Sequence, residues 1–290
     1  MEDRLLYTLA LGFTRGVGPM TAKALIEHFG HAGNVYRSLE SGLEGLKGFG
    51  AKLMQEIKIR RNKAMAMAQK ELDQAKTHGV SILGHWHPEF PKRLWRCPDS
   101  PLCVYRKGKA VYNHARTACI LGSDTTSIRY HPLLRYVLKG LKKYGVMLIC
   151  GNDSTWDRVL QKTSSDLQIP STIVLSESIY AGLDPVSKDS GRSFLSGYPG
   201  SAAVSSKKQM LKNRMLAGLS DVCIVVEASK SDSALAVAEK ANEYHRDVAA
   251  FPGSIWKQQS YGTHLLIKTH KAALISRMED LGYITGWTYG

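Results

Sequence analysis

A run of five apolar residues, 222–226, marks the most clearly predicted element of the chain. Every position in the run is apolar, which indicates a strand buried on both faces, as in the parallel sheets of α/β proteins. The segment before it, NRMLAGLS (213–220), is typical of a helix that ends in a Gly-Leu-Ser turn. Because that helix also carries several lysines and arginines, we expect the function to lie where the basic helix meets the buried strand.

From Ala115 onward, apolar strands alternate with helices along the chain. The predicted strands are 118–122, 146–150, 171–176, 222–226 and 248–251, and the predicted helices cover 131–144, a segment starting near 156, 232–244 and 262–269. This alternation predicts an α/β fold with a doubly wound, mostly parallel sheet. Ligands of such sheets bind at the carboxyl ends of the strands.

The first 80 residues contain two copies of a Gly-apolar-Gly turn, each followed directly by a helix. The turns are Gly16-Val17-Gly18 and Gly48-Phe49-Gly50, and a lysine follows each of them, Lys23 and Lys52. Exposed N–H groups at the start of a helix, next to a lysine, predict that each turn binds a phosphate backbone. The alternative is that the glycines only cap helices in a small bundle. A long helix over 51–78 closes this region, so we predict a helical domain at 1–80 and an α/β domain at 81–290.

The composition of the chain says little about its fold, but it indicates what kind of partner the protein binds. The net charge is +14 and the pI about 9.5, which favours phosphate-bearing partners, with nucleic acid as the first choice. The five cysteines lack the spacing of a zinc site and are predicted to be buried free thiols, and His85 with His87 has no third ligand. We therefore expect no metal. The apolar run 5–13 is too short for a membrane anchor, so we expect a cytoplasmic protein with no membrane partner.

Loops rich in Gly, Ser and Thr follow three of the predicted strands, at 122–127, 151–155 and 252–254. Small residues at helix starts favour an oxyanion, so these loops predict a cradle for phosphate or nucleotide. The chain contains neither GxGxxG nor GxxxxGK[ST], and it has no GxSxG elbow. These patterns predict a binding protein without cofactor rather than an enzyme.

Five segments, in this order along the chain, resemble the DNA-processing protein A family (DprA, also called Smf). They are FPKRLWRCPDSPLCVYRKG (90–108), NRMLAGLS (213–220), VEA (226–228), RDVAAFPG (246–253) and GTHLLI (262–267). The resemblance implies an extended Rossmann domain preceded by a small all-α domain of the helix-hairpin-helix or SAM-like kind. It also implies a protein that binds single-stranded DNA, forms a homodimer, and loads a RecA-type recombinase onto incoming strands during natural transformation.

The resemblance also implies where DNA binds. The pocket would be built from residues of the first loop and of the basic helix, and the predicted DNA-binding set is Gly122, Ser123, Ser127, Arg129, Lys207, Lys208, Lys212, Asn213 and Arg214. The alternative for Arg214 is a buried salt bridge to Glu227 or Asp221. Duplex DNA is a further expected partner of the N-terminal hairpins, through Gly16, Gly18, Lys23, Gly48, Gly50 and Lys52.

Several positions depart from the family pattern. Asp124 stands where the family has an arginine, and a carboxylate a few ångströms from a phosphate repels it by roughly 1 to 4 kcal/mol. The loop 150–157 keeps Gly151 and Asp157 but loses the family's small residues. The segment after Ile275 is too short for the winged-helix domain that many members carry. The sequence therefore predicts a divergent member whose pocket has changed.

Two other functions compete with single-strand binding. One is a small-nucleotide-binding or nucleotide-hydrolysing protein of the lysine-decarboxylase-like Rossmann group, which would need a Pro-Gly-Gly-x-Gly-Thr loop where this chain has Pro252-Gly253-Ser254. The other is a scaffold that holds duplex DNA through its N-terminal hairpins while the Rossmann part binds a protein. A specific rise in melting temperature with nucleotides would support the first function. Loss of all DNA binding on deletion of residues 1–80 would support the second.

Overall fold

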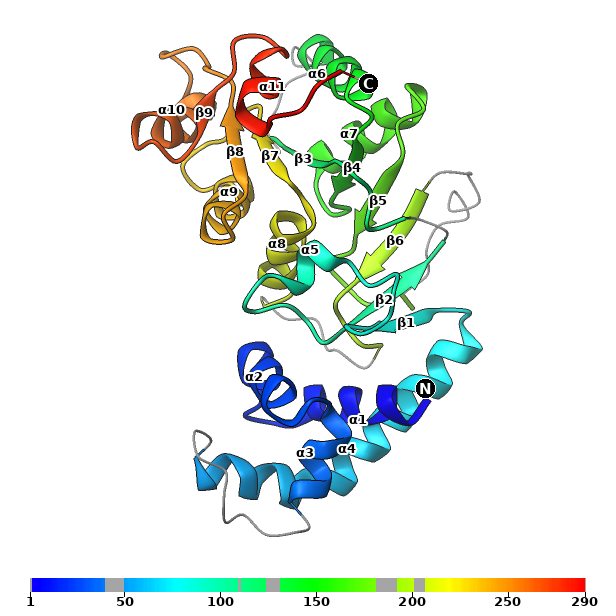
Figure 1. The fold of residues 1–290 in the computed structure, drawn as a ribbon. Coiled ribbons are helices and arrows are strands. Elements are labelled where there is room, and N and C mark those ends of the chain that lie inside the picture. The colour runs from blue at the N-terminus through cyan, green and yellow to red at the C-terminus, as the bar shows by residue number, and fades with distance from the viewer. Residues whose placement is uncertain are drawn as a thin grey trace.

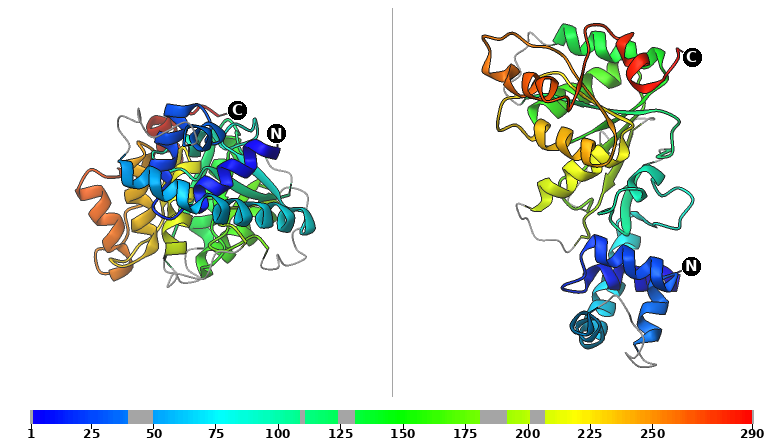
Figure 2. Two further views of the ribbon diagram at one scale, coloured as in Figure 1. Left: turned by 90° about the horizontal axis from the view of Figure 1, so that it is seen from below. Right: turned by 60° about the vertical axis from the view of Figure 1, so that its left-hand side comes forward.

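The computed structural model describes residues 2–39, 50–108, 111–123, 131–180, 192–200 and 207–289. Figures 1 and 2 show two lobes, a smaller helical one and a larger one built around a sheet. The helical lobe contains α1 (Glu2–Phe13), α2 (Pro19–Phe29), α3 (Ala32–Ser38) and α4 (Ala51–Thr77). Helices α2 and α4 begin directly after Gly18 and Gly50, as the two glycine turns predict.

The described part of the larger lobe forms one nine-stranded sheet in the order β1-β2-β6-β5-β4-β3-β7-β8-β9. Its strands are β1 (Ser81–Gly84), β2 (Cys103–Lys107), β3 (Thr117–Leu121), β4 (Met147–Cys150), β5 (Ser171–Val174), β6 (Arg192–Ser196), β7 (Val222–Val225), β8 (Asp247–Ala250) and β9 (Ala273–Leu274). Pairing is parallel from β6 through to β9, whereas β1 and β2 pair antiparallel at one edge. The predicted α/β class with a mostly parallel sheet is confirmed.

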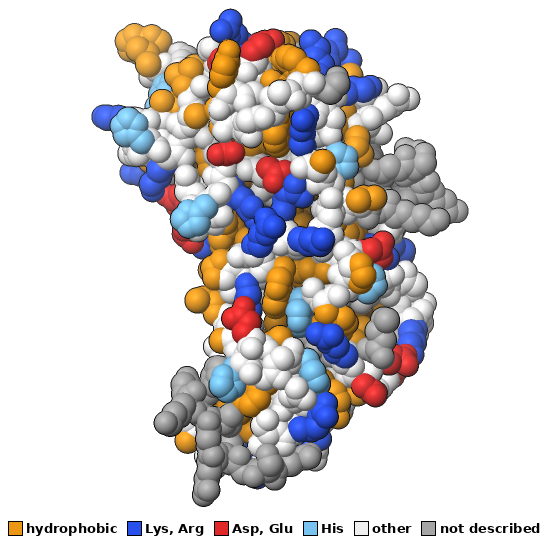
Figure 3. Space-filling model, viewed as in Figure 1, with side chains coloured by type: hydrophobic (Ala, Val, Ile, Leu, Met, Phe, Trp, Pro, Cys, Tyr) orange, Lys and Arg blue, Asp and Glu red, His pale blue; other side chains and the backbone are white. Residues whose placement is uncertain are grey.

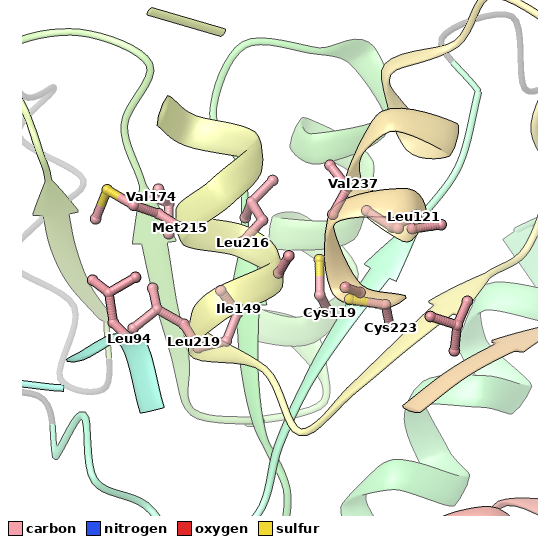
Figure 4. Close-up of a cluster of buried hydrophobic side chains, with 14 of the residues drawn as sticks. Leu94, Cys119, Leu121, Ile149, Val174, Met215, Leu216, Leu219, Cys223 and Val237 are labelled. Carbon is pink, nitrogen blue, oxygen red and sulfur yellow. The ribbon is translucent and has the colours of Figure 1, made fainter. Parts of the chain in front are cut away.

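Helices cover both faces of this sheet, which explains why the strands are continuously apolar. The helices of this lobe are α5 (Lys92–Trp95), α6 (His131–Lys143), α7 (Thr155–Asp166), α8 (Lys207–Leu219), α9 (Ser233–Glu243), α10 (Tyr261–Lys268) and α11 (Asp280–Thr285). Helices α8 and α9 pack on one face, where Figure 4 shows Met215, Leu216 and Leu219 of α8 over the strands. Helices α6, α7 and α11 pack on the other face. All five cysteines are buried and free, as predicted.

The strand order reverses its direction between β3 and β7, which are neighbours in the sheet. From β3 the chain moves through β4 and β5 towards one edge, and from β7 it moves through β8 and β9 towards the other. Loops diverge at such a switch point, so a crevice opens beyond the carboxyl ends of the two strands. The fold therefore directs attention to the residues that follow Leu121 and Val225.

The two lobes share an apolar core. Buried residues of α1 to α4 form one cluster with Cys103 and Tyr105 of β2, and with Ile173 of β5 and Leu175 just after it. The lobes also meet through Lys23, whose ammonium donates to the carbonyls of Trp95 (2.7 Å) and Cys97 (3.3 Å). The helices end at Thr77 and the sheet begins at Ser81, but a division into two independent domains at residue 80 remains a prediction.

Candidate nucleic-acid interface

A cavity of about 360 Å³ lies at the switch point of the sheet, beyond the carboxyl ends of the central strands. Its wall comes from the loops after β3, β4 and β7 and from the first turns of α8 and α9. The lining residues are Gly122, Asp153, Ser154, Gln209, Ser231, Asp232 and Ser233. Small and polar residues thus surround this cavity, and the loops after β3 and β4 that the sequence singles out meet there.

Gly122 is required at its position by a tryptophan. A Cβ atom on Gly122 would lie 2.4 Å from the ring of Trp156, which is only 5% exposed. The indole N–H of Trp156 donates to the carbonyl of Ile120 at 3.0 Å. Trp156 is therefore a buried support beneath Gly122, and its ring is not available to stack on a base. Ser123, next to Gly122, is also buried.

Lys212 is the buried cation of this region. Only 3% of the residue is exposed, its ammonium forms a short ion pair with Asp153 Oδ1, and Asp157 Oδ2 lies 4.0 Å away. When the Gln209 amide is oriented to suit its neighbours, its nitrogen donates to Asp153 Oδ2 at 2.9 Å and its oxygen accepts from Lys212 at 3.1 Å. The positive charge predicted to attract phosphate is thus already matched inside the protein.

Asp157 has a structural role at the start of α7. Its N–H donates to Ser154 Oγ (2.9 Å), and its carboxylate accepts from the N–H of Ser154 (3.3 Å), which together form a capping box. Burial raises the pKa of Asp157, although Lys212 and Ser154 oppose that rise. This carboxylate anchors the loop after β4, so it explains why Gly151 and Asp157 are both present: a Cβ on Gly151 would lie 2.4 Å from Asp157.

The described surroundings of the cavity contain more carboxylates than cations. Besides Asp153 and Asp157, Asp232 accepts from the N–H of Ser229 at 2.6 Å. Glu227, directly after β7, is 3% exposed, and its Oε2 has no hydrogen-bond partner among the described residues. Phosphate would therefore meet repulsion here unless Asp153 moved away from Lys212.

Arg214 lies apart from Lys212. Two residues along a helix are separated by about 200° around its axis, so the two side chains leave α8 on opposite sides. Arg214 pairs with Asp99 at 3.1 Å, and Asp99 also accepts from the hydroxyl of Tyr244. The suggested salt bridge to Glu227 or Asp221 is wrong, because Asp221 instead binds Arg93 at 2.5 Å. Arg214 therefore braces α8 against the loop after α5.

Other residues of the predicted set are only partly placed. Asn213 is 8% exposed. Lys207 and Lys208 form the first turn of α8, which places their backbone beside the cavity, but their side chains lie outside the described residues. Ser127 and Arg129, with Asp124, also lie outside them. Gly122, Ser123, Lys212 and Asn213 are thus the members that the structure brings to this end of the sheet.

The N-terminal hairpins differ from each other in the structure. Gly16 has a positive φ of 89°, and Gly18 precedes α2. Lys23 turns into the seam between the lobes, and its ammonium lies 4.7 Å from the centre of the Trp95 ring. A phosphate contact through Lys23 would have to break these bonds, and DNA binding by Lys23 stays a prediction. Lys52 is exposed after Gly50, and Gly48 lies outside the described residues.

Replacing Lys23 with alanine is expected to lower the free energy of unfolding by about 1 to 2 kcal/mol, because two charge-assisted hydrogen bonds and a cation–π contact are lost. Lys52→Ala is the matched control, and we expect it to change stability by less than about 0.5 kcal/mol. Urea unfolding of the two variants measures both. Equal stability together with weaker duplex binding by Lys23→Ala would instead favour the phosphate grip.

Two further searches of the described residues give negative results. They contain no group of three or more His, Cys, Asp or Glu side chains placed to hold a metal ion. Among them, no helix combines the length and the apolar composition that crossing a membrane requires.

Comparison with known proteins identifies the family. Residues 81–284 match the family model described as DNA recombination-mediator protein A. The chain belongs to this family. The match begins at the first strand of the sheet and covers the cavity at the switch point, and it assigns the chain to the recombination-mediator class of DNA-processing proteins. It does not favour the nucleotide hydrolase or the duplex scaffold.

Three members of this DprA family show how far the likeness extends. Protein Smf of Synechocystis sp. is 27% identical over 290 residues, which cover 95% of this chain and 71% of that protein. The structure of DNA processing protein A from Streptococcus pneumoniae superposes with a TM-score of 0.77 at 20% identity, covering 98% of this chain and 99% of that one. The Helicobacter pylori protein, whose structure concerns its single-stranded DNA binding mode, gives 0.61 at 17% identity, covering 72% and 97%.

Proposed function

We propose that this DprA-family protein binds single-stranded DNA at the cavity beyond the carboxyl ends of β3, β4 and β7. One observation carries the proposal: a match to the recombination-mediator family over 81–284 coincides with a cavity lined by Gly122, by Gln209 of α8 and by Asp153, the ion-pair partner of Lys212. The Helicobacter pylori relative is described as binding single-stranded DNA. The net charge of +14 supplies the long-range attraction that such a partner needs.

Binding at this cavity requires a phosphate to replace a carboxylate as the ion-pair partner of Lys212. A phosphate that approaches Lys212 must take the place of Asp153, whose side chain is 29% exposed and can therefore turn to solvent. The backbone N–H groups at the start of α7 and α9 then face the incoming anion. Affinity would depend more on the surrounding lysines than on a preformed phosphate pocket.

The family also supplies the expected partners. We infer that the protein acts as a homodimer and delivers the coated strand to a RecA-type recombinase, as a mediator rather than as an enzyme. An exposed apolar surface is present for protein contacts in the loop after β8, with Ile255 79% and Trp256 89% exposed. Exposed apolar side chains that gather in one region are typical of protein interfaces.

Fluorescence anisotropy with a labelled dT20 strand across a salt series tests the proposed function. We expect binding at low salt that weakens as salt rises, with a slope of about −0.7 for each phosphate contacted. A 20-base-pair duplex serves as the control, and we expect it to bind more weakly. If dT20 does not bind at low salt, or if its affinity is independent of salt, the proposed function is excluded.

A further inference from the structure

A second cavity, of about 480 Å³, lies at the opposite end of the sheet from the switch-point cavity. Arg116 directly precedes β3 and Tyr144 lies just before β4, so this cavity belongs to the amino ends of the parallel strands. It is lined by Tyr144, Glu279, Gly282, Tyr283, Gly286, Trp287, Thr288 and Tyr289. Four of these eight residues are aromatic. A five-residue strand separates the two ends by about 15 Å.

The aromatic rings form an ordered, accessible group. Tyr144 stacks on Tyr289 with ring centres 4.5 Å apart and an interplanar angle of 26°, and Trp287 lies 6.1 Å from Tyr144. Gly286, with a φ of 70°, ends α11 and turns the chain back so that residues 287–289 cover Tyr144. Tyr283 is 86% exposed and Tyr289 is 48% exposed, so both offer ring faces to a ligand.

Cations border these rings directly. The Arg116 guanidinium lies 6.0 Å from the Trp287 ring and donates to the carbonyls of Tyr144 (2.9 Å) and Thr288 (2.7 Å). Lys143 lies 5.9 Å from the Tyr289 ring. Both cations are thus held against the aromatic surface without a carboxylate among their described contacts.

Helix α6 extends this positive border. Its sequence, HPLLRYVLKGLKK, contains Arg135, Lys139, Lys142 and Lys143 and no acidic residue. Among the described residues none of these four has a carboxylate partner, and Lys142 donates to the carbonyl of Leu167 at 2.8 Å. Figure 3 shows lysine and arginine side chains gathered over α6 at the upper edge of the molecule.

Two acidic residues lie near this cavity, and both already accept hydrogen bonds. Glu279, on the cavity wall, accepts from the hydroxyl of Tyr289 at 3.3 Å. Asp280 accepts from the N–H and hydroxyl of Ser276 and lies 3.5 Å from Arg277. The local field is therefore positive, which disfavours a cationic ligand in this aromatic cavity and favours an anionic one that carries flat rings.

We propose that the aromatic cavity and α6 form a second binding site for single-stranded DNA. Bases stack on Tyr283, Trp287 and Tyr289, and phosphates lie along Lys139, Lys143 and Arg116. Stacking platforms beside a basic surface are how proteins bind single strands without reading their sequence. This second site rests on the proposed function because it takes the same ligand, single-stranded DNA, but it lies on a different surface of the protein. A strand long enough to reach from one end of the sheet to the other would occupy both sites.

Two double variants test this site through anisotropy with dT20. Tyr283→Ala with Tyr289→Ala is expected to weaken binding about fivefold or more while leaving the salt slope unchanged. Lys139→Ala with Lys143→Ala is expected to make the slope less steep by about 1.4, that is, two phosphate contacts. Lys70→Ala with Lys268→Ala removes the same charge from exposed positions on α4 and α10, and we expect little effect.

A measurement on the unaltered protein accompanies the variants. Photo-crosslinking to a 20-mer that contains 5-iododeoxyuridine, followed by peptide mapping, is expected to modify residues 283–289. If dT20 binds but both double variants behave as the wild type and cross-links fall only elsewhere, this second site is excluded while the proposed function stands. If the wild type does not bind dT20 at all, both are excluded.

Discussion

Replacing Lys212 with methionine is expected to lower the free energy of unfolding by about 3 kcal/mol. Methionine keeps the length and packing of the lysine stem, so the change removes mainly the charge. Without that charge, Asp153 and the buried Asp157 face each other with no cation between them. The expected loss is at the lower end for a broken buried pair, because Asp153 is 29% exposed and can turn to water.

A double variant separates charge from packing in this prediction. Adding Asp153→Asn to Lys212→Met removes the unpaired carboxylate, and we expect most of the lost stability to return. Asp157 needs no replacement, because burial already raises its pKa and so eases its protonation. Chemical unfolding of the wild type, both single variants and the double variant completes the cycle. If the double variant is as unstable as Lys212→Met alone, the loss of stability comes from altered packing and not from the unpaired charge.

Asp153→Asn by itself is expected to bind dT20 about tenfold more tightly than the wild type at low salt, a gain of about 1.4 kcal/mol. The substitution removes a carboxylate from the cavity wall and frees the ammonium of Lys212 for a phosphate. An asparagine oxygen can still accept a hydrogen bond from Lys212, so we expect the fold to be retained.

Asp73→Asn is the matched control for this gain, since it changes the net charge equally at an exposed position on α4, in the helical lobe. We expect it to improve binding by less than about twofold, as a screened and distant charge. If the two variants bind dT20 equally well, the cavity at the switch point does not contact the strand, and the site must be sought elsewhere on the protein.

The sequence predicts the central strands of the sheet well, but it does not predict β6 or β9. Strands β3, β4, β5, β7 and β8 are apolar runs between helices, and each is found within a residue or two of its predicted position. Strand β6, RSFLS, was missed because it is short and half polar, and it becomes a strand only by pairing between β5 and β2. Strand β9 has two residues and leaves no pattern to find.

The sequence predicts which loops meet at the switch-point cavity, but not how the charges around that cavity are paired. Glycines after β3 and β4 and the basic helix α8 predict a site at the carboxyl end of the sheet, and the structure places a cavity there. The ion pair between Lys212 and Asp153 joins residues 59 positions apart, and Lys23 meets Trp95 across 72 positions. No local pattern reports such pairings. The aromatic cavity near residues 283–289 was missed for the same reason, because Tyr144 and Arg116 complete it from distant segments.

The apolar core shared by the two lobes can form only late in synthesis on the ribosome. Helices α1 to α4 end at Thr77, yet the apolar surface that they bury against the sheet includes Leu175, roughly 100 residues later. At about 5 to 20 residues per second, that partner is synthesised about 5 to 20 s after the helices. During this interval the apolar face of the nascent helical lobe is exposed to solvent. We therefore expect chaperones at the ribosome exit to bind it.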